Sequence, residues 1–160
     1  LQNLTLGDCF NQKLENLPNN LQNLTLGGHF NKKLENLPNN LQNLTLGDCF
    51  NQKLENLPNN LQNLTFGWHF NQKLENLPNN LQNLTLGHDF NQSLNPCVAL
   101  PKLQNLTLKI YYKLEIPPLF NTTIIFAYDN NKIYKKIYEN YKNYSIITWK
   151  NIFYKSIIIK

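Results

Sequence analysis

The chain has 160 residues, a formal net charge of +5, 41% hydrophobic residues and three cysteines. This length suits one folding unit, and three cysteines are too few for a disulfide scaffold. No apolar run approaches the ~18 residues of a membrane-spanning helix, and the absence of arginine argues against an arginine-based reader of phosphate or nucleic acid.

The first hundred residues repeat with a period of 20. Residues 1–20 read LQNLTLGDCFNQKLENLPNN, and residues 41–60 are identical to them. The repeats are numbered here as coil 1 (1–20), coil 2 (21–40), coil 3 (41–60), coil 4 (61–80) and coil 5 (81–102), and positions are counted from the first leucine of each coil. Coil 6 begins at Leu103, and Ile124-Ile125-Phe126 belongs to a degenerate seventh unit. Because the chain begins inside a repeat, we expect an N-terminal part of the protein to be missing.

Each coil contains one short alternation of apolar and polar residues. In coil 1 this is Leu4-Thr5-Leu6, which predicts a strand with its leucines inward and positions 3, 5 and 7 outward. Gly7 is expected to free the backbone to turn, and residues 17–20 to form the next corner around a proline. Parallel strands are therefore predicted near residues 3–6, 23–26, 43–46, 63–66, 83–86 and 105–108, with no helix longer than about two turns before residue 127.

A single coil buries too few apolar side chains to offset the entropy of ordering its backbone, so the coils must stack. We predict a mainly β, leucine-rich-repeat-like solenoid over residues 1–126, with about seven coils, the last two degenerate, and an irregular convex side. The first strand exposes unpaired backbone groups, so self-association through an uncapped N-terminal edge is expected.

Residues 127–160 have a different pattern and hold much of the lysine. Apolar residues at helical spacing over 133–144 predict a helix, and the isoleucine-rich residues 145–160 predict one or two strands. We interpret the segment as a C-terminal mixed α/β cap or tail. The alternative is a basic, tyrosine-rich surface for nucleic acid or anionic membrane, which the lack of arginine and of a nucleic-acid motif disfavours. Its lysines would be Lys132, Lys135, Lys136 and Lys142.

An asparagine follows the phenylalanine of every regular coil, where the chain leaves the strand and backbone groups lose their partners. Its amide can satisfy such groups in its own and the next coil. A structural ladder is therefore predicted for Asn11, Asn31, Asn51, Asn71 and Asn91.

Position 9 carries possible metal ligands, in order Cys9, His29, Cys49, His69 and Asp89. Zinc needs ligand atoms that converge at ~2.0–2.3 Å. Five coils about 4.8 Å apart spread this column over roughly 19 Å, so we expect no metal site. No serine or cysteine stands beside a histidine and an orienting acid in a non-repeated pocket, so we also expect no catalytic residues and no cofactor. A metal-dependent hydrolase that uses the Cys/His column is the enzyme alternative.

Asn-Leu-Thr recurs in the strands and is formally an N-glycosylation acceptor. The unpaired cysteines favour a reducing compartment, so we interpret Asn3, Thr5 and their equivalents as strand residues. The expected location is the cytoplasm, which would be the host-cell cytoplasm for a viral protein.

Positions 8 and 9 vary most among the regular coils, whereas positions 1 to 5, 7, 10, 11 and 14 never change. They follow the strand on the rim of the concave sheet, where solenoids meet ligands, and an exposed tryptophan there is a natural anchor. Drift after duplication is the alternative. The predicted partner-binding rim comprises Asp8, Asp48, Trp68, His69, His88 and Asp89.

The pattern LxxLxL is the strand signature of leucine-rich repeats. The longer string LPNNLQNLTLGDCFNQKL closely resembles the FNIP repeat, named for its Phe-Asn-Ile-Pro core, over residues 1–94. Lys13-Leu14 stands where the family has Ile-Pro, and the period is 20 instead of 22. The resemblance implies a non-enzymatic protein-interaction module. Such arrays are typical of social amoebae and of giant DNA viruses. The asparagine-rich composition indicates coding from an AT-rich genome, which suits both sources.

FNIP arrays often lie downstream of an F-box. The resemblance therefore implies a substrate-recruiting array of an F-box-type ubiquitin ligase adaptor, with a ligase subunit as partner if an F-box precedes Leu1. The sequence does not name the protein that would be recruited.

Overall fold

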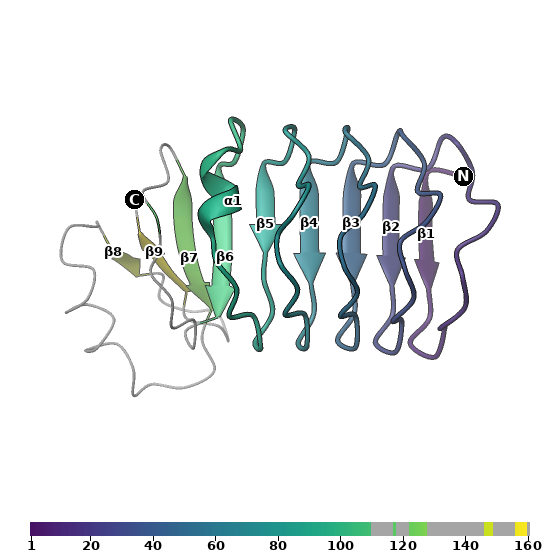
Figure 1. The fold of residues 1–160 in the computed structure, drawn as a ribbon, viewed down its shortest axis with the longest axis horizontal. Helices are drawn as coiled ribbons and strands as arrows, with labels where there is room; N and C mark the ends of the chain where they lie inside the picture. Colours follow the sequence, from purple (N-terminus) through teal and green to yellow (C-terminus); the bar gives the residue numbers. More distant parts are fainter. Residues whose placement is uncertain (110–116, 118–121, 128–145, 149–155, 160) are drawn as a thin grey trace.

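The computed structural model describes residues 1–109, 117, 122–127, 146–148 and 156–159, and these form a β-solenoid (Figure 1). The six predicted strands are confirmed, although β5 ends one residue early while the Leu86 N–H still donates to the Thr107 carbonyl at 2.9 Å. The strands are β1 (Asn3–Leu6), β2 (Asn23–Leu26), β3 (Asn43–Leu46), β4 (Asn63–Phe66), β5 (Asn83–Thr85) and β6 (Asn105–Lys109).

Neighbouring strands pair in parallel without any slip in register. Asn3 lies opposite Asn23, and the same pairing of position 3 continues to Asn105. A slip of one residue would turn the buried leucines outward, so the hydrophobic pattern fixes this register. Strand β7 (Thr123–Ala127) pairs in parallel with β6, which confirms a strand in the degenerate seventh unit.

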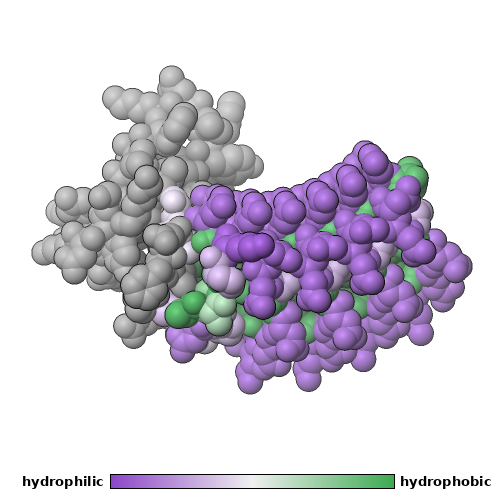
Figure 2. All heavy atoms as spheres, turned by 90° about the horizontal axis from the view of Figure 1, so that it is seen from above, coloured by the Kyte–Doolittle hydropathy of each residue, from purple (hydrophilic) through white to green (hydrophobic). Residues whose placement is uncertain are grey.

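The core lies between the strands and the returning segments and is built from equivalent residues of successive coils. The leucines at positions 1, 4 and 14 and the phenylalanine at position 10 are buried in coils 2 to 5. The rings of Phe30, Phe50 and Phe70 are fully buried and stack with centroids 6.1 Å apart. Figure 2 shows a mainly hydrophilic surface along the described coils, as expected when the apolar side chains gather inside.

The turns of each coil differ in part from the prediction. The corner at residues 17–20 is confirmed, because the Leu21 N–H donates to the Pro18 carbonyl at 3.0 Å. The chain turns after Gly7, where the Phe10 N–H donates to the Gly7 carbonyl at 3.0 Å, but no glycine of the described residues has a positive φ. Left-handed backbone occurs instead at position 16, with φ of 54° to 57° at Asn16, Asn36, Asn56 and Asn76. Asparagine tolerates this conformation better than most residues.

Coil 5 accommodates its two extra residues with a single helical turn, α1 (Asn95–Val98). A proline stands in the first turn of α1, where its missing N–H costs nothing. Within the described part of residues 1–126 this is the only helix, in agreement with the prediction of no long one. Cys97 of α1 is buried, and this burial raises the pKa of its thiol to about 12.

Two further strands extend the sheet beyond β7. Strand β9 (Ser156–Ile159) pairs antiparallel with both β7 and β8 (Ile146–Thr148), which gives the order β1-β2-β3-β4-β5-β6-β7-β9-β8. The strands predicted in residues 145–160 are therefore confirmed, and the helix predicted over 133–144 lies outside the described residues. That residues 127–160 act as a cap stays a prediction. No helix among the described residues has the length and apolar character needed to cross a bilayer.

Candidate partner-binding rim

Positions 8 and 9 lie in the turn that follows each strand. At these turns the N–H of position 9 donates to the carbonyl of position 8 in the preceding coil, at 2.8 to 2.9 Å. These bonds join His29 to Asp8, Cys49 to Gly28, His69 to Asp48 and Asp89 to Trp68. They fix each turn on the next, so the side chains of positions 8 and 9 form two adjacent columns. These two columns in coils 1 to 5 are called the rim below.

Aspartate at position 8 caps the turn of the following coil. The Asp8 Oδ1 accepts from the Gly28 N–H at 3.2 Å, and the Asp48 Oδ1 accepts from the Trp68 N–H at 3.1 Å. Both carboxylates are exposed, and each leaves its second oxygen outside these bonds. A rim aspartate therefore orders the backbone while presenting negative charge to solvent.

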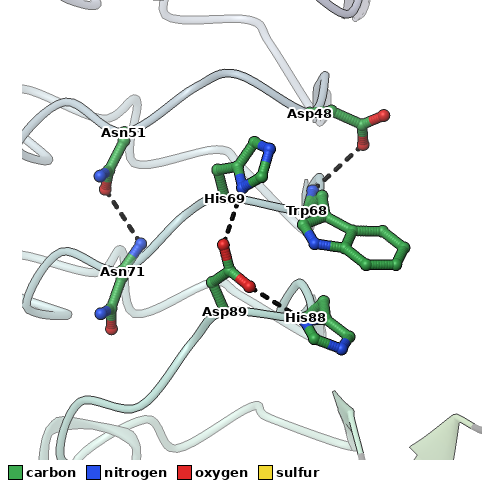
Figure 3. A network of polar contacts seen from close by, with 7 residues as sticks. All are labelled: Asp48, Asn51, Trp68, His69, Asn71, His88 and Asp89. Atoms are coloured by element: carbon green, nitrogen blue, oxygen red, sulfur yellow. Dashed lines mark hydrogen bonds and ion pairs between the residues drawn. The ribbon is translucent and has the colours of Figure 1, made fainter.

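Trp68 and His88 form an aromatic pair on the rim. Their rings stack with centroids 4.4 Å apart and an interplanar angle of 15°, and Trp68 is 43% exposed (Figure 3). His88 of coil 5 therefore supports the indole from one side, and Asp48 stands in the coil on its other side. A supported yet exposed indole is the type of side chain that anchors protein interfaces.

Asp89 links the two columns through two histidines. Its Oδ2 lies 2.7 Å from His69 Nδ1, and its Oδ1 lies 2.9 Å from His88 Nδ1 (Figure 3). The hydrogen bond with His88, followed by that with His69, holds the pKa of the Asp89 carboxyl below its ordinary value. Asp89 is thus ionised at neutral pH and orients the imidazole that packs against Trp68.

Position 9 does not assemble a metal site in the described part of the chain. Only neighbouring coils bring its side chains together, as in the contact of His69 with Asp89, and no group of three or more possible ligands converges among the described residues. Cys9, Cys49 and Cys97 are all free thiols. The rim therefore offers an aromatic surface and carboxylates for binding.

The asparagines at position 11 connect each coil to the next. The Oδ1 of each accepts the backbone N–H of the following asparagine at 2.9 to 3.0 Å, from Asn11 through to Asn91. From Asn31 onward the same oxygen also accepts from the next glutamine, as in Gln52 Nε2 to Asn31 Oδ1 at 2.9 Å. The amide thus satisfies backbone donors that have no strand partner.

A second asparagine ladder, which the sequence analysis missed, runs along position 3. The Nδ2 of each asparagine donates to the Oδ1 of its equivalent in the preceding coil, and the chain of bonds links Asn3, Asn23, Asn43, Asn63, Asn83 and Asn105. The signal was the same as for Asn11, an invariant asparagine with a period of 20. The Asn-Leu-Thr stretches are therefore part of a hydrogen-bonded sheet face.

The lysines of coils 1 to 4 lie away from the rim, at positions 12 and 13. Shallow grooves between coils on this returning segment are lined by residues such as Lys53, Glu55 and Gln72. Within the described residues, the ion pairs closer than 4 Å are those of Asp89 with its two histidines, so these lysines and glutamates form a solvated surface.

The repeats have known relatives. The sequence profile of the FNIP repeat matches residues 10–49, 30–67, 50–77 and 70–109. The chain belongs to the FNIP repeat family. No curated protein matches it. Among solved structures it is similar to the giant-virus protein CroV588, described as a novel circular LRR protein structure, with 35% identity and a TM-score of 0.60. The similarity covers 78% of this chain and 23% of CroV588, so the chain spans about a quarter of that protein.

The position-11 ladder and the predicted rim residues, apart from Asp8, fall within the matched part of the chain. The lysines of the basic-tail alternative, Lys132 to Lys142, lie outside the described residues. The structure brings Trp68, His88, Asp89, His69 and Asp48 together. Asp8 lies two coils from Asp48 and contacts Gly28 instead.

Proposed function

We propose that this FNIP array is a non-enzymatic protein-binding module that contacts its partner through the rim. The observation that carries the proposal is the exposed Trp68, stacked on His88, at positions that vary while the frame is constant. Aromatic residues in supported, partly exposed settings supply most of the binding energy in many interfaces.

The separation of frame and rim supports this proposal. Positions 1, 4, 10 and 14 fill the core, and positions 3 and 11 carry hydrogen-bond ladders between coils. A substitution at any of these disturbs the stack. Positions 8 and 9 bury no large side chain in coils 1 to 4, so substitutions there change the surface and leave the frame intact. Drift would use the same freedom, which makes a binding experiment necessary.

The test is a Trp68→Ala substitution against peptides selected from a displayed random library on the wild-type protein. We expect the substitution to weaken their binding by more than ~1 kcal/mol, or about fivefold or more, while the unfolding curve stays nearly unchanged. Gln12→Ala, an exposed change on the returning segment, is the matched control and should bind as the wild type does. Peptides that bind the Trp68→Ala variant as tightly as the wild type would show that the rim is not the binding surface. Loss of folding in the variant would show that Trp68 is a packing residue.

We also propose, from the family resemblance, that the array recruits substrates for an F-box-type ubiquitin ligase in the cytoplasm. FNIP arrays often follow an F-box, and the chain spans only about a quarter of CroV588. The full-length protein is expected to co-purify with a ligase subunit from its host cell. Consistent failure to recover one, with the protein folded and expressed, would reject this role and leave the binding module intact.

A further inference from the structure

Charge is segregated between two surfaces of coils 1 to 5. The rim carries three carboxylates, Asp8, Asp48 and Asp89, and no lysine. The lysines of these coils lie at positions 12 and 13, on the returning segment, except Lys102, which ends coil 5 and donates to Asn80 Oδ1 at 2.6 Å. The strand that follows coil 5, β6, ends at Lys109, one coil beyond Asp89. The rim is therefore negative in a protein whose net charge is positive, and a partner that binds it meets this local charge first.

The surroundings of Trp68 set the shape of that partner's contact. His88 covers the indole on the side of coil 5. On the side of coil 3 stands Asp48, exposed and held by its bond to the Trp68 N–H. One coil further back, position 8 is Gly28, and a Cβ added there would meet only Asp8 Oδ1, at 3.8 Å. An exposed aromatic ring with a fixed carboxylate beside it and open space behind that carboxylate is thus built into the rim.

This combination fits a cationic side chain. A guanidinium stacks on an aromatic face and pairs with a carboxylate in the same plane, and an ammonium makes the same two contacts as a point charge. Each contact alone is weak on an exposed surface, and the two together gain from the restricted positions of both groups. Phosphate groups of nucleic acids or lipids would instead face three carboxylates.

We propose that the rim binds a basic peptide segment, with an arginine or lysine side chain seated on Trp68 beside Asp48. The inference rests on the proposed function and adds the chemistry of the partner to it. The Asp89 carboxylate and His88 hold the far side of the indole in place.

The experiment uses three synthetic peptides of 12 residues that alternate serine with arginine, with citrulline or with glutamate. Citrulline keeps the shape of arginine and removes its charge. Binding to the full chain is followed by NMR on the indole N–H of Trp68, assigned with a Trp68→Phe variant. We expect the arginine peptide to shift this signal, the citrulline peptide to bind at least fivefold more weakly, and the glutamate peptide not to shift it. Added salt should weaken the arginine complex, because exposed charge pairs are screened.

Two isosteric variants locate the charge. Asp48→Asn keeps an oxygen that accepts from the Trp68 N–H and should weaken the arginine peptide about fivefold. Asp8→Asn makes the same change two coils away and should weaken it less than twofold. Equal affinity for the arginine and citrulline peptides would overturn the proposal, as would equal effects of the two variants. If Asp48→Asn did not fold, the comparison of arginine with citrulline on the wild type would still decide.

The outcomes separate this inference from the proposed function. Library peptides that depend on Trp68 but show no enrichment in lysine or arginine would leave the rim as a binding surface and remove the basic partner. A stronger shift of the Trp68 signal by a single-stranded oligonucleotide, or by vesicles of anionic lipid, than by the arginine peptide would also remove it. If no peptide bound in a Trp68-dependent manner, the proposal that the rim is a binding surface would be rejected as well.

Discussion

Replacing Gly47 by alanine should destabilise the solenoid by about 3 kcal/mol, whereas replacing Gly28 should change its stability very little. The two glycines belong to adjacent coils and differ in what a Cβ would meet. At Gly47 it would lie 2.3 Å from the Gly27 carbonyl oxygen and 2.5 Å from the Gly27 carbonyl carbon. These are backbone atoms held in the ladder between coils, so they cannot move aside as a flexible side chain would.

Urea unfolding of both variants, with the wild type, measures the difference. Gly28→Ala controls for the general effect of exchanging glycine for alanine near the same turn, because a Cβ there has only one neighbour, at 3.8 Å. Gly7→Ala is a second control at the same coil position as Gly47, since a Cβ at Gly7 meets nothing within 4 Å. Equal midpoints for Gly47→Ala and Gly28→Ala would show that close approach of the coils does not select glycine at position 7.

Glycine at position 7 also shows where reasoning from the sequence stops. The sequence pattern indicates that Gly7 frees the backbone to turn, yet the described glycines all have negative φ. The glycine is needed because each turn lies close to the turn of the preceding coil. A Cβ added at Gly47 would lie 2.3 Å from the Gly27 carbonyl oxygen. This distance depends on how two coils stack, which the pattern within one coil does not contain. The left-handed backbone occurs at Asn16 and its equivalents instead. The sequence has no feature that distinguishes these asparagines from the others of each coil.

The strands, by contrast, could be predicted nearly to the residue. Leucines two positions apart can share a buried face only in an extended chain, and a proline in each regular coil prevents a long helix. An exact repeat then fixes the register, because Asn3 must lie opposite Asn23 for the leucines of both coils to enter one core. The end of β5 and the helical turn at residues 95–98 were less predictable, since they occur where coil 5 departs from the repeat.

The rim was predictable as two columns of residues but not as a set of contacts. Position alone places His69, Asp89 and His88 near one another. Which of them pair depends on side-chain rotamers and on the exact offset of the coils. The structure joins both histidines to Asp89 and stacks His88 on Trp68, so one carboxylate orders the support of the exposed indole. The basic-peptide inference depends on this arrangement.

A second large effect is expected at Phe50, in the middle of the phenylalanine stack. Its ring is fully buried and lies 6.1 Å from the rings of Phe30 and Phe70, and 6.3 Å from that of Phe66. Phe50→Ala removes contacts with both neighbouring coils and leaves a cavity that the rigid ladders on either side cannot close. We expect a loss of about 4 kcal/mol of stability.

The matched control is Phe10→Ala, the same change in coil 1. Phe10 is only partly buried, and its ring stacks on Phe30 at 6.1 Å, so we expect less than half the effect of Phe50→Ala. In a solenoid each coil is stabilised mainly by its neighbours, so the damage should also differ in extent. Amide hydrogen exchange should rise across coils 2 to 4 in Phe50→Ala and mainly in coils 1 and 2 in Phe10→Ala. Equal losses of stability, or exchange that rises uniformly along the chain in both variants, would contradict nearest-neighbour stabilisation. The described coils would then unfold as one unit. The effect of a rim substitution such as Trp68→Ala would in that case have to be compared with the stability of the whole array.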